Sequence, residues 1–306
     1  MGWLAVVGLL VWLMHDRGYD PDFDTGVAEP AYRGGGPLVL FDEGHRNTHT
    51  ASGAYQPFVE LLRHDGYAVS VLDGPVAPER LSGVAVLVVV CAQGANETSD
   101  EPAFTGDEAS AIERWVLAGG ALLLVTDHWP FGPAVESLAG RFGVQMGGGL
   151  VQDVAHCEPS LGDSHLVFAR GDGLLRDHPL LDGRSAAERV ERVLTFTGQS
   201  LVGPPGTTAF LALSDDATER PPGTPRVERD GGDVRITMEY GEPVPARGRA
   251  QGLALEHGRG RVVVLGEAGL LRAQRESGGR LVGMNHPGCD NRQLALNLMH
   301  WLSRAL

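Results

Sequence analysis

Histidines and carboxylates gather directly after an early apolar stretch of this chain. Residues 41–50 read FDEGHRNTHT and supply two histidines, two acids and an asparagine: Asp42, Glu43, His45, Asn47 and His49. Side chains of these types exchange protons with substrates or ligate divalent metals. Their spacing differs from the H-E-x-x-H motif of zinc peptidases. A second interpretation is a turn whose polar side chains satisfy backbone N–H groups.

Two further apolar stretches end in reactive side chains. Asp127 and His128 stand in VTDHWPFG, and Glu267 closes RVVVLGE. Asp127 alternatively caps the helix expected after it. A purely structural role is less expected for Glu267 than for Asp127, because burying an acid at the end of an apolar strand does not stabilise the fold.

A polar loop precedes the last helical stretch of the chain. It reads GMNHPGCDN and contains Asn285, His286 and Asp290, which we interpret with Asn47 as substrate-binding residues. The alternative is that Asp290 or Asn291 serves only as the N-cap of the closing helix.

The absence of lysine excludes several mechanisms. All 25 basic residues other than histidine are arginines, so a P-loop lysine and a lysine Schiff base are ruled out. A formal net charge of −14 also argues against nucleic-acid partners. Neither G-x-S-x-G, G-x-C-x-G nor G-x-G-x-x-G follows an expected strand, and we interpret Cys91 as a packing residue.

Strands and helices alternate from Pro37 onward. Apolar runs predict strands at 38–41, 67–72, 84–90 and 121–126. Helical spacing predicts helices at 55–64, 105–119 and 133–142, the second beginning with a Thr105–Glu108 capping box. This order indicates a parallel, doubly wound, flavodoxin-like α/β sheet, in which ligands bind at the carboxyl ends of strands. The three reactive strand ends converge only if the sheet places their strands side by side.

The second half of the chain departs from this alternation. Residues 151–250 contain short strand-like pieces between turns, which we interpret as a β-rich insertion or cover within an α/β domain of residues 37–306. Residues 214–232 are charged and rich in Pro and Gly, which favours a mobile loop. Residues 251–257 and 261–266 predict a hairpin, and residues 291–306 a closing helix.

The N-terminal residues 1–36 predict a signal-like or anchor segment followed by a tether. Gly2–Met14 is continuously apolar but shorter than a membrane span, as in the core of a signal peptide. The alternative is a buried first strand. We therefore expect an extracytoplasmic protein, secreted, periplasmic or anchored, whose only membrane contact is this segment.

The three reactive stretches also carry a family resemblance. VLFDEGHRNTHTASGAYQPFVELLRHDGY, FTGDEASAIERWVLAGGALLLVTDHWPFG and RVVVLGEAGLL with GMNHPGCDNRQLALNLMHWL resemble a group of mostly uncharacterised bacterial proteins. That group belongs with the class I glutamine amidotransferase-like fold, near a domain of unknown function shared with gliding-motility and intraflagellar-transport proteins. The resemblance implies that fold over 37–142 and 251–306. It also implies that Asp127-His128 stands where amidotransferases have their nucleophilic cysteine, so thioester chemistry is not expected.

Three functions remain open from the sequence. The first is a metal-assisted or acid/base hydrolase of a small polar or glycan-like substrate, with the catalytic candidates Asp42, Glu43, His45, Asp127, His128 and Glu267. A metal, zinc or another divalent ion, would be held by His45, His49, His128 and Glu267. The second is a non-catalytic module that binds a ligand or partner. The third is a structural exported protein whose polar strand ends are only caps.

Overall fold

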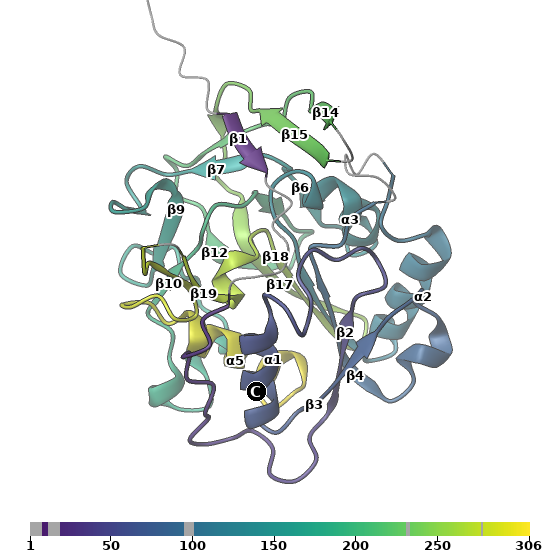
Figure 1. The fold of residues 1–306 in the computed structure, drawn as a ribbon. Coiled ribbons are helices and arrows are strands. Elements are labelled where there is room, and N and C mark those ends of the chain that lie inside the picture. The colour runs from purple at the N-terminus through teal and green to yellow at the C-terminus, as the bar shows by residue number, and fades with distance from the viewer. Residues whose placement is uncertain (1–7, 12–18, 95–100, 231–232, 277) are drawn as a thin grey trace, which may run out of the picture.

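The computed structural model describes residues 8–11, 19–94, 101–230, 233–276 and 278–306, and shows a mixed α/β fold (Figure 1). Its central sheet has nine strands in the described part of the chain. In spatial order these are β3 (Ala68–Leu72), β2 (Leu38–Asp42), β4 (Val84–Val90), β5 (Ala121–Val125), β18 (Gly260–Leu265), β17 (Ala250–His257), β11 (Leu201–Val202) and β6 (Gln145–Met146), with β12 (Thr208–Ala212) also on β17. The first five run parallel, and β17 returns antiparallel to β18.

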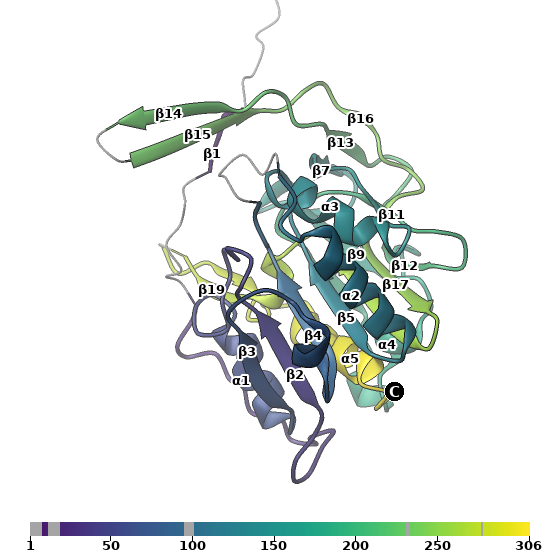
Figure 2. The same cartoon turned by 90° about the vertical axis from the view of Figure 1, so that its right-hand side faces the viewer.

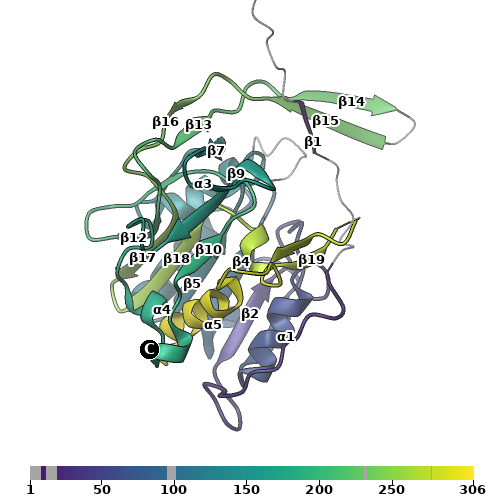
Figure 3. The same ribbon diagram turned by 90° about the vertical axis from the view of Figure 1, so that its left-hand side faces the viewer.

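Two pairs of helices cover the two faces of this sheet. Helices α1 (Gln56–His64) and α5 (Asn291–Leu302) pack on one face (Figure 3). Helices α2 (Gly106–Leu117) and α3 (Phe131–Gly140) pack on the other (Figure 2). Every residue of β5 is buried, as expected for a parallel strand covered on both faces. The predicted doubly wound core is therefore present, and the 251–266 hairpin is confirmed.

The helix boundaries follow local sequence signals. Thr105 caps α2 by accepting the N–H of Glu108, and the Glu108 side chain accepts the N–H of Thr105 in return. The predicted capping box is thus confirmed. Helix α5 begins after Asp290 as predicted, but the Asp290 side chain makes no capping hydrogen bond to it.

Residues 151–250 are mostly β-structure, but they are joined to the central sheet. Besides β11 and β12, they hold β8 (Cys157–Glu158), β9 (Gly162–Ala169), β10 (Arg192–Leu194), β13 (Thr218–Arg220), β14 (Arg226–Asp230), β15 (Asp233–Glu239) and β16 (Val244–Pro245), with β7 at Leu150–Gln152 and the short helix α4 at Pro179–Asp182. The 214–232 stretch predicted as a loop contains β13 and β14. Strand β13 pairs antiparallel with β7 and β16, which are distant in sequence, and β14 forms a hairpin with the next strand, β15.

The hairpin of β14 and β15, called the arm below, extends from the body of the molecule (Figure 2). At its base Met238 and Tyr240 pack with Trp129, just beyond β5. Strand β1 (Gly8–Val11) pairs with β15, which places that part of the predicted signal-like segment in a strand. The remainder, 2–7 and 12–14, lies outside the described residues.

The segment predicted as a tether is packed on the body over its described part, 19–36. Phe23, Val27 and Tyr32 contact the core, and the buried Asp20 binds Arg275. No helix among the described residues is both long and apolar enough to cross a membrane.

Candidate functional site

Asp127 and Glu267 lie side by side at the carboxyl edge of the sheet. Their strands, β5 and β18, are parallel neighbours with Val125 opposite Leu265. The N–H of Thr126 donates to the oxygen of Leu265 at 2.9 Å, which carries the pairing one residue further. The N–H of Ala268 donates to Asp127 Oδ2 at 3.3 Å. Two of the three predicted strand ends therefore converge.

The Glu267 carboxyl group is completely buried. It accepts the N–H groups of Gly269 and Leu270, the latter at 2.8 Å, and so caps the 3₁₀ turn Gly269–Leu271. Gly198, at φ +105°, lies against it, and a Cβ there would stand 2.7 Å from the Cβ of Glu267. Burial, and then the charge of Asp127, raise the pKa of Glu267 to about 8. The protonated form of this carboxyl is therefore favoured.

Asp127 is the accessible member of this pair, with 14% of its side chain exposed. Its Oδ1 accepts the N–H of His128 at 2.7 Å. Burial raises the pKa of Asp127, against the opposing charges of His128 and Arg272. Two neighbouring carboxyls with raised pKa values titrate as a pair rather than singly.

His128 completes this end of β5. Its Nδ1 is 2.8 Å from the carbonyl oxygen of Trp129, an acceptor, so Nδ1 carries the proton and Nε2 faces Asp127 Oδ1 at 3.5 Å. The hydroxyl of Tyr240, from the base of the arm, lies 3.2 Å from the same Nδ1. The predicted Asp127–His128 pair is therefore in place and lies under the arm.

Cys91 lies at the centre of the edge, although its sequence context suggested only packing. It follows β4, which stands between β2 and β5, and it adopts φ +42°, a region that residues with a Cβ rarely occupy. It is 1% exposed, and burial, with the charges of Asp127 and Glu267, raises the pKa of its thiol. A thiol in this state is a poor nucleophile at neutral pH.

Arg272 also lies at this edge, and no sequence motif pointed to it. It follows the 3₁₀ turn that Glu267 caps, and it interacts electrostatically with Asp127, Cys91 and His49. Its Nε is buried and has no hydrogen-bond partner among the described residues. An arginine in this position is available to an oxyanion of a ligand.

His49 reaches the same edge in a neutral form. Its ring stacks on Tyr55 with centroids 5.6 Å apart. Burial, and then the charge of Arg272, lower the pKa of His49 to about 3. The Tyr55 hydroxyl donates to the oxygen of Ala268 at 2.7 Å, which ties this side of the site to the turn after Glu267.

The end of β2 forms a separate cluster, which we call the His45 clamp: Asp42, His45, Asn47 and Glu108. His45 Nδ1 is 2.7 Å from Asp42 and Nε2 is 3.0 Å from Glu108, while its ring stacks on Phe104. Burial lowers the pKa of His45, but the two carboxylates outweigh it and raise the pKa overall. With both ring nitrogens engaged, His45 is neither a free base nor a free metal ligand.

Other candidates hold backbone segments in place. Asn47 donates to Asp42 and to the oxygen of Val90, and Glu43 accepts the N–H of Ala51. Asn285 donates to Asp20, and Asp290 accepts the N–H groups of residues 191 and 192 beside β10. Glu43, Asn47, Asn285 and Asp290 therefore have structural partners, whereas His286, beside Phe196, has a buried Nδ1 without one among the described residues.

The comparisons with known proteins show the fold. No family model matches the chain, and no curated protein matches it. The mmIFT52 N-terminal domain is similar in structure, with a TM-score of 0.57 and 14% identity over 87% of this chain and 97% of that one. A ThuA-like protein from Bacteroides uniformis has a TM-score of 0.39 at 13% identity, covering 93% and 95%. A GMP synthase-like protein from Thermoplasma acidophilum has 0.43 at 11%, covering 89% and 96%.

The likeness to the mmIFT52 domain agrees with the predicted relation to intraflagellar-transport proteins at the level of fold. The two weaker likenesses add no argument to it. At such low identity the shared fold carries no activity over to this chain.

The predicted metal-ligand set is not assembled. Among the described residues, no group of three or more His, Cys, Asp or Glu side chains is placed to hold a metal ion. His45 is saturated by carboxylates in its clamp, and His49 stacks on Tyr55. His45 lies in its clamp, whereas His49, from the same loop after β2, reaches the edge near Arg272, so the four residues do not form one ligand set.

Proposed function

We propose that the carboxyl edge is an acid/base site that hydrolyses a small polar substrate, such as a glycan, without a covalent enzyme intermediate. The observation that supports this most is the Asp127–Glu267 pair, two adjacent carboxyls whose pKa values are both raised by burial. Such pairs, with environments that separate acid from base, are typical of hydrolytic sites. The edge is also where ligands bind in this class of sheet.

The roles follow from exposure and hydrogen bonding. Asp127, the exposed member, would take a proton from the attacking water, and Glu267 would set its basicity from beneath. His128 Nε2 faces Asp127 and would return a proton to the leaving group when protonated. Arg272 would hold the oxyanion that develops on the substrate.

A screen of chromogenic glycosides, esters and amides tests this proposal. Asp127→Asn should lower any turnover about 100-fold or more, in the range expected for loss of a general base. Asp172→Asn, an exposed acid in a turn, is the matched control and should leave turnover unchanged. Turnover that survives Asp127→Asn and Glu267→Gln would place the chemistry elsewhere.

One observation favours a second function, a non-catalytic binding module. Several predicted reactive groups, including His45, Asn47 and Asp290, are saturated by internal hydrogen bonds. A binding module needs only the remaining open groups, Arg272 and His128. Under this proposal, Arg272→Met lowers the affinity for a ligand found by binding screens. The wild-type protein turns over none of the glycosides, esters and amides.

We also propose that the protein is extracytoplasmic, supported by the apolar run Gly2–Met14. Expression of the full chain followed by cell fractionation tests this. Recovery in the soluble cytoplasm, with the N-terminus intact, would contradict it.

A further inference from the structure

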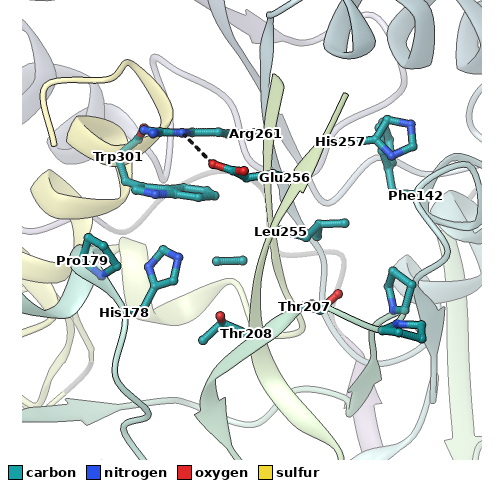
Figure 4. Close-up of a pocket in the computed structure, with 14 residues that line it drawn as sticks. Phe142, His178, Pro179, Thr207, Thr208, Leu255, Glu256, His257, Arg261 and Trp301 are labelled. Carbon is teal, nitrogen blue, oxygen red and sulfur yellow. Dashed lines mark hydrogen bonds and ion pairs between the residues drawn. The ribbon is translucent and has the colours of Figure 1, made fainter. Parts of the chain in front are cut away.

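Two adjoining hollows lie along β12 and β17, the strands beyond β18 in the central sheet. The larger has a volume of about 630 Å³ (Figure 4) and the smaller about 500 Å³, and Thr207 and Thr208 line both. Arg261, at the start of β18, lines the larger hollow, whereas Glu267 follows the far end of the same strand. Six residues of extended strand separate them, roughly 20 Å. The larger hollow is therefore distinct from the carboxyl-edge site.

The smaller hollow carries unpaired positive charge. Arg176 and Arg249 both line it, and neither guanidinium has an ion pair or hydrogen bond among the described residues. The Arg249 Nε and the Thr207 hydroxyl are buried without partners in that part of the chain. The acid beside them, Asp177, is fully exposed and lies 3.5 Å from Arg170. On a chain of net charge −14, two unpaired arginines at one hollow favour an anionic ligand.

The larger hollow combines apolar side chains with a larger share of polar groups. Phe142, Leu255 and three prolines (Pro179, Pro204 and Pro205) form the walls. The N–H of Leu180 donates to His178 Nδ1 at 3.3 Å, so the proton of the neutral ring is on Nε2. Burial and the charge of Arg261 lower the pKa of His178 to about 4, which keeps it neutral at pH 7. Arg261 Nε is 4.0 Å from Glu256, and Figure 4 marks this ion pair among the residues that line the hollow.

We propose that the two hollows together bind a small phosphate ester. Its phosphate lies between Arg176 and Arg249, where two guanidinium groups and the threonine hydroxyls supply donors. Its organic part, a sugar or a nucleoside, extends past Thr208 into the larger hollow, where His178 and Arg261 meet its hydroxyl or ring atoms. The volumes lie within the range of small-molecule sites. This proposal does not depend on the proposed hydrolase.

Calorimetric titration of the full-length protein tests the proposal with three probes: inorganic phosphate, glucose 6-phosphate and AMP. We expect saturable one-to-one binding, with at least one ester bound tenfold or more tightly than inorganic phosphate. Whichever of glucose 6-phosphate and AMP binds more tightly indicates whether the organic part of the ligand is a sugar or a nucleoside. Backbone amide NMR signals of residues 206–208 and 248–249 should shift on addition of that ester, which places it without any substitution.

Matched substitutions distinguish specific binding in the hollows from a general attraction of the anionic ester to positive charge. Arg176→Met and Arg249→Met should each lower the affinity for the ester tenfold or more. Arg247→Met removes the same charge from an exposed position two residues away that does not line either hollow, and it should change the affinity less than twofold. Absence of saturable binding by all three probes, or equal binding by wild type, Arg176→Met and Arg249→Met, would overturn the proposal. If neither ester binds more tightly than inorganic phosphate, the proposal that the larger hollow holds the organic part of the ligand is wrong.

Discussion

Glu267 shows how one residue can be both a structural cap and a chemical group. Its carboxyl oxygens accept the backbone N–H groups of the turn that follows, which favours the ionised form. Burial and the neighbouring Asp127 act in the other direction and prevail. The result is a buried carboxyl with a raised pKa beside a partly exposed one, and the proposed chemistry rests on this pair.

The raised pKa of Glu267 predicts a pH-dependent stability. Because the folded state holds this proton up to about pH 8 while an unfolded glutamate releases it near its ordinary value, the stabilisation is complete in acid and is lost as pH rises toward 8. The slope from one such group is at most about 1.4 kcal/mol per pH unit. Urea unfolding from pH 5 to 8 should show this decline in wild type and a flatter profile in Glu267→Gln. Identical profiles would contradict the assignment.

His45 makes a second residue-scale prediction. His45→Ala would leave Asp42 and Glu108 buried without their shared cation, a loss of about 3–5 kcal/mol in unfolding free energy. The pKa of His45 is raised, so its stabilisation is present below pH 6.5 and fades as pH rises through the folded value. His64→Gln, at an exposed histidine on α1, is the control for denaturant titrations at pH 6. A loss for His45→Ala no larger than for His64→Gln would show that the clamp is not structural.

Sequence patterns predicted most elements because each depends on local signals. The apolar runs of β4 and β5 and the Thr105 capping box each lie within a dozen residues. They located the strand ends, and parallel pairing of β5 with β18 then brought Asp127 to Glu267 as proposed. Asp42 and His45 did not join them, because β4 lies between and strand order is set by tertiary packing, whereas His49 from the following loop reaches Arg272.

The partners missed from the sequence are distant in the chain. Glu108 was recognised as a capping residue, but its second role on His45 spans 63 residues. Arg272 lies in a stretch without a motif, and the position of Cys91 at the centre of the edge follows only from strand order. The same holds for Tyr240, which reaches His128 from the base of the arm.

Helix α2 provides the element-scale prediction. Thr105→Ala removes one cap acceptor and should cost about 1 kcal/mol of unfolding free energy. Glu108→Ala should cost several times more, about 3–5 kcal/mol, because it also unpairs His45 inside the fold and the N–H of Val76. Equilibrium denaturation of both variants measures the difference. Equal losses would mean that Glu108 acts only as a cap.

At the scale of the molecule, the segment of residues 19–36 is part of the fold. The N–H of Asp20 donates to the oxygen of Ala273 at 2.6 Å, and its carboxylate binds Arg275 and Asn285. These contacts hold the pKa of Asp20 below its usual value, although burial acts against them. Composition alone suggested a tether, because the partners of Asp20 lie more than 250 residues away and those of Ala31 and Glu29 lie 34 and 155 residues away.

Asp20 therefore controls the attachment of this segment. Asp20→Ala should release it and speed limited proteolysis between residues 19 and 36 several-fold. Asp22→Ala, at an exposed acid that also contacts Arg275, is the matched control and should cleave at the wild-type rate. Unchanged cleavage of Asp20→Ala would show that the apolar contacts of Phe23, Val27 and Tyr32 suffice.

The central claim is that a proton resides on the Asp127–Glu267 pair at neutral pH. Infrared spectroscopy of the carboxylic acid carbonyl stretch measures it directly. The account predicts a protonated-carboxyl band at pH 7 that disappears with a midpoint near pH 8 and is missing in Glu267→Gln. A wild-type spectrum without that band at pH 7, or a band unchanged by Glu267→Gln, would contradict it.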